Sequence, residues 1–569
     1  MATPWNIRGS GSQLFYQDKK SAQYAALLEI SALPHPDRSI LAFFINESVD
    51  PEEAGRYFLR VTSSENKLAS TSKLQEFLSK WKILTEKFRP VESNSLSEET
   101  KSIIYSRDGG RCCATDVSFT STADRDATFA HVVSPFVFED QELSDGTTLC
   151  DMLEVFIGET SLKQSRSLLS PVSADLHCNI FLLHREAFSD FKQGQITFKP
   201  SYMDENKDPA LQQAYFIHDR VPNPKRPNRH HLSSTKTLEN RTPEKSLIIS
   251  KDLLDLNRRF SHPIEWIGIG KFINTSSDGP RKAPPCFGST YLASLLRPIR
   301  TLWTCLPCCF RAFVYDKLVL IGLRLYGPTL SMTVYRLPFN LYLRRGSPRF
   351  AEKFATEANT LSMVKEFTSI PAPQALDVLH TSQFSYLLMT RVAGRPIGPS
   401  ISFMTDDQIK QVVCDLKQYV SELRQIPNPY KEFKICNSKG GGILDWRIPD
   451  SQREELRFKT EADFNKYLTD PFWDDIRRQA AISHNIQHDI VFTHGDLNMR
   501  NILAENGRVS GIIDWENAGW YPEYWEYTKA HYTVRSVIHW LADVVDRVFE
   551  GYRDELIVEN MLSDLLGPF

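Results

Sequence analysis

The order of apolar and polar positions predicts a chain of mixed helices and strands. Thr405 and Gln408 form a capping-box pattern, in which each side chain satisfies a backbone donor at a helix start. Apolar residues then recur at helical spacing from Ile409 to Leu423, which predicts a helix with one buried face. The short apolar run Val509–Ile513 is rich in β-branched residues and predicts a strand instead.

Three further apolar segments shape the expected fold. The run Ser39–Ile45 is strand-like, whereas Ser72–Phe88 has the pattern of a helix. The segment Leu302–Tyr326 is apolar but interrupted by Arg and Lys side chains and by Asp316, so it predicts strands or a helix against a core and no membrane span. Met1–Gln13 lacks a basic region followed by an apolar run, so no secretory signal is expected.

Composition along the chain divides it into three zones. Residues 1–220 and 312–569 mix strand-like and helical runs, and each is long enough for its own core. Residues 221–311 are rich in Pro, Ser, Thr, Asn and basic residues, which predicts a linker or irregular connection. The basic stretch Arg220–His231 could contact phosphate or be a solvated part of that linker. The predicted fold class is therefore α+β, in two modules.

Charge and cysteine content exclude several classes of protein. Apolar residues make up 41% of the 569 residues and charged residues 24%, with a net charge of −3, which excludes a disordered, collagenous or coiled-coil chain. Without a signal the ten cysteines are expected to be reduced, as in an intracellular protein of the cytoplasm or nucleus. Cys305 and Cys308 have C-x-x-C spacing, but no second pair follows, so buried thiols are favoured over zinc. Nothing specific supports acylation of the adjacent cysteines.

The strongest chemical signal lies in the last hundred residues. Asp496 and Asn501 have the spacing of a kinase catalytic loop, and Asp514 follows thirteen residues later at the end of an apolar run. Phosphoryl transfer needs a carboxylate near the acceptor hydroxyl and oxygen ligands for Mg²⁺. Asp496 is therefore the candidate base, with Asn501 and Asp514 as candidate metal ligands. His494 is expected to brace the loop through hydrogen bonds.

Residues from about 315 to 530 resemble the aminoglycoside phosphotransferase family, in particular its large fungal group of kinase-like proteins. Besides the loop, the motifs that carry the resemblance are Val334–Pro338, Leu341–Gly346, Thr368–Pro373 and Leu387–Arg395. The resemblance implies a bilobal protein-kinase-like fold, with ATP between a small sheet-rich lobe and a helical lobe. It implies that adenine meets the backbone of Tyr386–Val392, where Met389 and Arg391 lie, and that Glu357 pairs with the phosphate-binding cation.

Two departures from that family concern the phosphate site. The family's phosphate-binding strand usually carries a Lys, where this chain offers Arg344 or Arg345. Arg keeps the charge, but its planar fork binds phosphate differently. The sequence also lacks a G-x-G-x-x-G motif, and Gly322 and Gly327 are expected to form the nearest loop. Gly440–Gly442 is expected to be a turn on the substrate side.

A second constellation lies between residues 98 and 200. Its motifs are Tyr105–Thr115, Phe129–Pro135 and Leu176–Phe188, and they resemble the fungal HNH-endonuclease-like domain, of the ββα-metal type. Such nucleases hold one divalent metal, and the resemblance implies His131 as general base and Asn179 as the residue that orients it. The family's helix His falls at Phe188, which cannot bind a metal. His184 lies one helical turn earlier and is the candidate replacement ligand.

Three functional hypotheses follow. The first is an ATP- and Mg²⁺-dependent phosphotransferase that acts on a small-molecule hydroxyl, with Arg344 as phosphate clamp. The second is an HNH-type nuclease that acts on nucleic acid through His131, with a regulatory kinase-like part; Mn²⁺-dependent plasmid nicking that is lost in His131→Ala would support it. The third is a scaffold in which both sites have decayed. A merged gene model, joined somewhere in 221–310, would also place two unrelated modules in one chain.

Overall fold

The computed structural model describes most of the chain, with several gaps. The described residues are 20–63, 67–93, 96–169, 176–200, 213–219, 236–238, 249–275, 302–329, 331–444, 456–469, 474–483, 486–532 and 540–566. They divide into two compact units, one within residues 20–275 and the other within residues 302–566. Each unit has its own core and is described separately.

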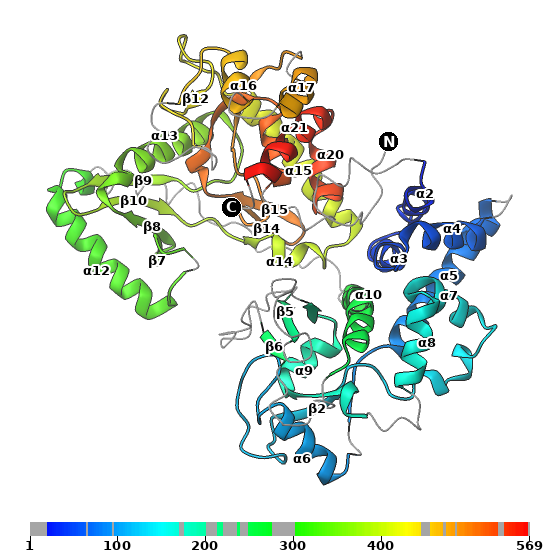
Figure 1. Ribbon diagram of the computed structural model, residues 1–569. Coiled ribbons are helices and arrows are strands. Elements are labelled where there is room, and N and C mark those ends of the chain that lie inside the picture. Colours follow the sequence, from blue (N-terminus) through cyan, green and yellow to red (C-terminus); the bar gives the residue numbers. More distant parts are fainter. Residues whose placement is uncertain are drawn as a thin grey trace. The chain divides into compact units, whose positions relative to one another are not determined.

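The first unit joins helices with short antiparallel sheets (Figure 1). Its helices are α2 (Ala22–Ile30), α3 (Asp37–Asn46), α4 (Pro51–Thr62), α5 (Lys67–Lys87), α6 (Glu98–Arg107), α7 (Thr148–Ile157), α8 (Glu159–Leu168), α9 (Arg185–Lys192) and α10 (Lys251–Thr275). Its strands are β1 (Val91–Glu92), β2 (Ala127–His131), β3 (Ile180–His184), β4 (Ile196–Pro200), β5 (Gln213–Asp219) and β6 (Lys236–Leu238). Strands β1, β2 and β3 pair in that order, as do β4, β5 and β6.

The strand prediction for Ser39–Ile45 was wrong, because these residues lie in helix α3. Both faces of α3 are covered, because eight of its ten residues are buried. Phe44 and Ile45 are fully buried among them. A short run that is apolar on all sides has no period, so its sequence does not distinguish a buried helix from a strand. The helical pattern near residues 72–88 is confirmed by α5.

The connection predicted over 221–311 contains a long helix. Helix α10 packs against α3, α5 and β4 of the first unit. Its Phe260 is fully buried and stacks on Phe88 at 4.3 Å between ring centroids. Residues 251–275 are therefore part of the first unit's core, which corrects the linker prediction for this stretch. The clearest Pro-rich and basic stretch behind the linker prediction, Arg220–His231, lies outside the described residues.

The second unit begins with a small antiparallel sheet covered by a helix on each face. The strands β7 (Val334–Leu337), β8 (Leu341–Gly346), β10 (Ser385–Thr390) and β9 (Ala375–His380) pair in that spatial order. Along β10, Tyr386 and Leu388 pack toward α12 (Cys308–Tyr326), while Leu387 and Met389 pack toward α13 (Ala351–Phe367). The alternation is the period of two that a strand imposes on its side chains.

Helix α12 lies very close to strand β7, and a glycine permits this approach. A Cβ atom added at Gly322 would lie 2.1 Å from the carbonyl oxygen of Arg336, so only glycine fits there. Gly322 therefore serves helix–strand packing, which corrects its expected place in a phosphate loop. Gly327 ends α12 with a positive φ of 72°.

The rest of the second unit is mainly helical, with short strands around the predicted catalytic loop (Figure 1). Its elements are β11 (Arg395–Pro396), α14 (Gly398–Ile401), α15 (Asp406–Arg424), β12 (Cys436–Asn437), α16 (Glu461–Thr469), α17 (Asp474–Ser483), β13 (Ile490–Thr493), β14 (Ile502–Glu505), β15 (Arg508–Ile512), β16 (Gly519–Pro522), α18 (Trp525–Tyr532), α20 (Asp546–Val548) and α21 (Arg553–Leu566). The capping box at Thr405, the helix after it and the strand near Val509 are confirmed. Gly440 lies in a turn, as expected, with φ 76°.

Among the described helices, none has the length and apolar character needed to cross a membrane.

Candidate active site

The predicted catalytic loop follows strand β13 directly and is sharply bent. Gly495 has a positive φ of 78°, and a Cβ atom there would lie 2.6 Å from the carbonyl oxygen of Asn517. Only glycine fits this position without displacing the backbone of Asn517. The bend places Asp496, which is 6% exposed, at the start of the loop.

Two buried side chains hold the loop from behind. Glu526, on α18, accepts hydrogen bonds from the backbone N–H groups of His494, Gly495 and Leu497 at 2.6–3.1 Å. His494 accepts at Nδ1 from the backbone N–H of Asp496 at 3.2 Å, and its Nε2 lies 3.0 Å from the carbonyl oxygen of Ile513. This pair of contacts defines the tautomer protonated at Nε2. His494 is fully buried, which lowers its pKa to about 4, so it is neutral near pH 7. The brace expected from the sequence is present.

Asp496 is oriented by two amides. Its Oδ1 accepts from Nδ2 of Asn498 at 2.7 Å, and its Oδ2 accepts from Nδ2 of Asn501 at 2.8 Å. Since the amide nitrogen of Asn501 is directed at Asp496, its amide oxygen is the atom left for another ligand. Burial raises the pKa of Asp496 to about 6, although the two amides act against this rise and the charge of Asp514 adds to it.

A β-hairpin brings Asp514 to the same place. Strands β14 and β15 pair with Ile502 opposite Ile512, and the backbone N–H of Ile513 donates to the carbonyl oxygen of Asn501 at 2.9 Å. Asp514 follows immediately in a left-handed conformation, with φ 69° and ψ 61°. Asp is among the few residue types that tolerate this region, and such backbone strain is concentrated at functional sites.

Arg344 of strand β8 joins the small sheet to this hairpin. Its Nη1 lies 2.5 Å from Oε2 of Glu357 on α13, and its Nη2 lies 3.0 Å from Oδ1 of Asp514 and 2.7 Å from Oε2 of Glu516. The pairing expected between Glu357 and a cation on this strand is thus made by Arg344. The other candidate, Arg345, instead contacts Asp316 of α12 at 3.2 Å.

The cluster contains a second cation and an excess of negative charge. Lys353, on α13, lies 2.9 Å from Oε1 of Glu516, so this carboxylate bridges two cations. Three carboxylates thus face two cations, and Asp496 stands beside them. Among the described residues, Nε of Arg344 is buried and has no hydrogen-bond partner. The side chain of Asp514 is 36% exposed, the most accessible of the three carboxylates.

Burial and the cations compete in setting the carboxylate pKa values. Burial raises the pKa of Glu357 to about 7, despite the opposing charge of Arg344. Burial alone would also raise the pKa of Glu516, but Arg344 and Lys353 outweigh it and lower that pKa. Glu516 is therefore ionised in the resting site near neutral pH.

The expected adenine-binding strand lies beside this cluster. Met389 is buried between α13 and the sheet, so its side chain belongs to the core. The backbone N–H groups of Thr390 and Arg391 donate to the carbonyl oxygens of Gln374 and Asn340 at 3.0 and 2.8 Å. These two backbone donors are therefore already used within the small lobe.

Sequence analysis missed Lys353, Glu516 and Glu526. Glu516 had a signal, because it stands two residues after Asp514. Lys353 had a weaker signal, since it lies one helical turn before Glu357 on the same helix. Glu526 had none, because its role depends on α18 packing behind a loop thirty residues earlier.

The residues predicted for the nuclease site in the first unit are not all brought together. In the β2–β3 ladder His131 lies opposite Ile180, and His184 lies opposite Ala127. Four residues of strand separate the two histidines, about 13 Å along the ladder, which is too far to share one metal ion. His184 is the N-cap of α9, so it does not share a helical face with Phe188 as the sequence suggested.

Asn179 and His131 are neighbours but make separate contacts. The side chain of Asn179 accepts from the backbone N–H of Val133 and donates to its carbonyl oxygen, at 3.0 and 2.8 Å. Burial lowers the pKa of His131 to about 4. Among the described residues, no group of three His, Cys, Asp or Glu side chains is placed to hold a metal ion. Cys305 and Cys308 are exposed, which contradicts the expectation of buried thiols.

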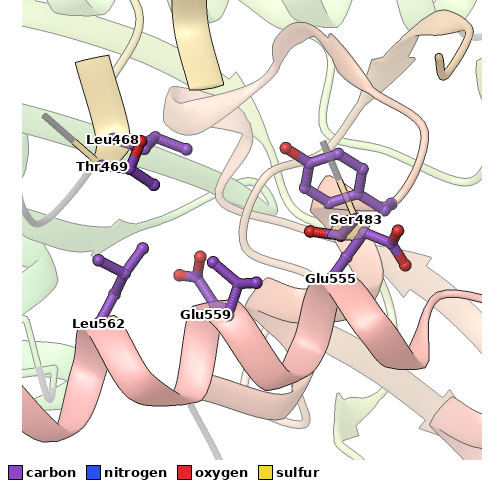
Figure 2. A pocket seen from close by; sticks show the side chains of 8 residues that line it. Leu468, Thr469, Ser483, Glu555, Glu559 and Leu562 are labelled. Carbon is purple, nitrogen blue, oxygen red and sulfur yellow. The ribbon is translucent and has the colours of Figure 1, made fainter. Parts of the chain in front are cut away.

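A separate cavity lies in the helical part of the second unit (Figure 2). Glu555 and Glu559 of α21 line it, and Leu468 and Thr469 lie across from Leu562. Its carboxylates belong to ion pairs: Glu555 lies 3.5 Å from Nε2 of His488, and Glu559 lies 3.4 Å from Nζ of Lys529. The cavity therefore lies among buried ion pairs of the helical part.

Comparison with known proteins finds similarities in the C-terminal half. Residues 332–557 match the phosphotransferase enzyme family. An aminoglycoside 3'-phosphotransferase of Escherichia coli is 24% identical over 192 residues, which cover 32% of this chain and 66% of the relative. Another, of Salmonella typhimurium, is 24% identical over 179 residues, which cover 31% and 61%. The chain spans slightly less than two thirds of these relatives' length.

Two solved structures are also similar to this chain. The GDP complex of a mutant aminoglycoside 2'-phosphotransferase IIIa has a TM-score of 0.32 and 13% identity, with 44% of this chain and 86% of that chain covered. Aminoglycoside phosphotransferase APH(3'')-Id from Streptomyces rimosus, in complex with ADP and streptomycin, has a TM-score of 0.29 and 18% identity, with 43% and 95% covered.

Proposed function

We propose, from the premise that residues 332–557 form a domain of the phosphotransferase enzyme family, that this chain transfers the γ-phosphoryl group of ATP to a hydroxyl of a small molecule. The observation that carries the proposal is one cluster of side chains from distant segments. Arg344 contacts both Glu357 and Asp514, while Asn501 holds the carboxylate of Asp496. Kinase-type transfer requires these charges together, because it proceeds mainly by positioning and electrostatic stabilisation.

Asp496 is the general base of this proposal. The amides of Asn498 and Asn501 hold the carboxylate of Asp496 in one orientation, which is the orientation an acceptor hydroxyl would meet. A carboxylate with a pKa near 6 is ionised at neutral pH and still basic enough to accept the proton of an acceptor hydroxyl. His494 does not exchange a proton in this scheme, because burial keeps it neutral.

The charge of the cluster fits a divalent cation with a nucleotide. Carboxylate and amide oxygens are the ligands that Mg²⁺ prefers, and Asp514 and Asn501 present them. Such an ion would neutralise charge on the β- and γ-phosphates. Arg344 and Lys353 would face the phosphates as cations, and the buried Nε–H of Arg344 is a donor that still lacks an acceptor among the described residues.

The acceptor is a small molecule whose class is to be found by a screen. Relatives with 24% identity are named for aminoglycosides, so aminoglycosides belong in that screen. They are not inferred as the substrate, because acceptor recognition in such folds depends on side chains of the helical part.

A thermal-shift experiment tests nucleotide binding on the full chain. We expect Mg²⁺ with ATP to raise the melting temperature by several degrees, and ATP with excess EDTA to raise it much less. Asp514→Asn should abolish the Mg²⁺-dependent part of the shift. The matched control is Asp407→Asn, whose carboxylate is 92% exposed at the start of α15. An equal shift in both variants would contradict the proposal.

Transfer itself is tested by a panel of hydroxyl compounds with [γ-³²P]ATP. The proposal expects a labelled product with at least one acceptor class and loss of labelling in Asp496→Asn. Because Asp496→Asn should retain the thermal shift with Mg²⁺ and ATP, the two measurements separate binding from chemistry. Nucleotide binding without transfer across a broad panel would favour the scaffold hypothesis.

A further inference from the structure

Helix α12 is apolar on two opposite sides, and only one of them is covered. Tyr315 and Val319 are buried against the small sheet, in a core that includes Leu343 and Tyr386. A helix that is apolar all round is normally buried all round. The exposed apolar side of α12 therefore indicates that another surface binds there.

Buried polar contacts fix which side faces outward. Nη1 of Arg311 lies 2.6 and 2.7 Å from the two carboxylate oxygens of Asp377 on β9, and the hydroxyl of Tyr315 donates to the same carboxylate at 2.5 Å. Both Arg311 and Asp377 are less than a tenth exposed. Rotation of α12 about its axis would leave these charges buried without partners, at a cost of several kcal/mol. The orientation of the helix is thus set by the fold.

The outward side is a continuous stripe at helical spacing. It consists of Phe310, Phe313, Lys317, Leu320, Ile321 and Arg324. Phe310, Phe313, Leu320 and Ile321 are 48%, 58%, 61% and 46% exposed, which is high for side chains of this size. An exposed apolar patch of neighbouring large side chains marks an interaction surface more often than a lone exposed residue does.

The charges of the stripe are all positive. Lys317 and Arg324 are exposed, and Nζ of Lys317 lies 5.2 Å from the ring centroid of Phe313. Asp316, the one carboxylate of α12, is turned away and contacts Arg345 and the hydroxyl of Tyr386. Large apolar and aromatic side chains between lysine and arginine are the composition of helices that lie in a membrane interface. Anionic headgroups would meet the two cations.

We infer that the α12 stripe docks this protein on an anionic lipid surface, with the helix in the plane of the interface and its opposite side held on the small sheet. The apolar side chains would enter the boundary between headgroups and acyl chains. Lys317 and Arg324 would extend their charged ends to lipid phosphates. A single such helix gives reversible binding, which favours a peripheral and salt-sensitive association.

Vesicle co-sedimentation of the full chain tests this inference. We expect binding to vesicles of phosphatidylcholine with about one third phosphatidylserine, and weaker binding to phosphatidylcholine alone, because the cations prefer anionic lipid. Raising the salt from low to high concentration should weaken binding to anionic vesicles several-fold. Absence of binding to either vesicle at low salt would overturn the inference.

Two variants locate the surface. Phe313→Ser with Leu320→Ser should lower vesicle binding at least tenfold. The matched control, Phe367→Ser with Ile486→Ser, removes one aromatic and one aliphatic side chain that are 46% and 50% exposed elsewhere in the same unit, and should leave binding unchanged. Equal loss in both, or in neither, would overturn the inference.

A charge variant keeps the test decisive if the apolar variant is unstable. Lys317→Glu with Arg324→Glu should remove the preference for anionic vesicles while the melting temperature stays near that of the wild type, since both side chains are exposed. Light scattering in the absence of lipid tests the alternative that a second copy of the chain covers the stripe. A dimer that the Phe313→Ser, Leu320→Ser variant dissociates, together with unchanged vesicle binding, would assign the stripe to a second copy of the chain and overturn the lipid surface.

Discussion

At the scale of single residues, Arg344 has a structural role, and the proposed function gives it a second one. Its side chain is 11% exposed and contacts three carboxylates, of which Glu357 is almost fully buried. A buried charge that loses its partner costs about 3–5 kcal/mol. The planar fork of arginine presents five N–H donors in a fixed geometry, whereas the ammonium of lysine presents three donors from one point.

We expect Arg344→Ala to lower the free energy of unfolding by about 3 kcal/mol at pH 8, because Glu357 then lacks its cation. The loss should be smaller at pH 6. The folded-state pKa of Glu357 is already raised to about 7, so the folded protein takes up a proton as the pH falls and the uncompensated charge disappears. Urea unfolding at the two pH values measures this. Arg344→Lys should lose less, and Arg349→Ala, at an exposed arginine five residues after Arg344, should lose almost nothing. A loss that is the same at both pH values would contradict the role given to Glu357.

We expect the pKa of Asp496 to set the acid limb of the proposed activity. A base acts only in its ionised form, so turnover should fall as the pH drops through about 6, the raised pKa of Asp496, and tenfold per unit below it. His494, with a pKa near 4, should add no inflection between pH 5 and 8. Rates of phosphate transfer or of ATP hydrolysis between pH 4.5 and 8.5 measure this profile. An acid limb near pH 4, the ordinary pKa of Asp, would argue against buried Asp496 as the base.

At the scale of elements, the catalytic loop depends on helix α18. Glu526 of this helix accepts hydrogen bonds from the backbone N–H groups of His494, Gly495 and Leu497. Glu526→Ala leaves these donors buried without a partner, at about 1–3 kcal/mol each. We therefore expect a loss of stability of about 3 kcal/mol or more, and a larger fall in kcat than in nucleotide affinity.

Glu526→Gln is the informative comparison. The amide oxygen of Gln can replace the oxygen that serves His494 and Gly495, whereas its NH₂ group cannot accept from Leu497. The loss should then be about 1–2 kcal/mol. Chemical unfolding measures the loss of stability, and the thermal shift with nucleotide measures any loss of nucleotide binding. A Gln variant as damaging as the Ala variant would show that the charge, and not the acceptor geometry, holds the loop.

Local patterns predicted elements well where one rule dominated. The capping box and the amphipathic helix α15 were predicted because Thr405 and the apolar positions after it follow a single period. The spacing from Asp496 to Asn501 predicted two site residues in one short loop, whereas the hydrogen bond from the amide of Asn501 to the carboxylate of Asp496 came only from the structure. Helix α3 was missed because it is covered on all sides and so shows no period. The contacts of Lys353 and Glu516 with Arg344 could not be read from the sequence, since they join a strand, a helix and a turn that only the fold brings together.

At the scale of the whole molecule, the position of α10 changes how the chain divides. The sequence placed residues 221–311 between two modules, because polar and Pro-rich segments at both ends dominate the composition of this stretch. The structure assigns residues 251–275 to the first unit through buried residues such as Phe260 and Leu253. The composition of residues 221–311 is an average over the whole stretch. The apolar residues of one helix within it do not change this average enough to reveal the helix.

Two units with separate cores predict two separable unfolding events in the intact chain. Scanning calorimetry should show two transitions, since multidomain chains depart from two-state behaviour. Phe260→Ala removes an aromatic side chain from the first core and should lower that unit's free energy of unfolding by about 3–5 kcal/mol, and with it the temperature of one transition. Arg344→Ala should lower the temperature of the other transition. Mg²⁺ with ATP at a hundred times its Kd adds about 2.7 kcal/mol to the state that binds it. We therefore expect nucleotide to raise only the temperature of the transition that Arg344→Ala lowers. A rise in the temperature of the transition that Phe260→Ala lowers would place the nucleotide site in the first unit and contradict the proposal.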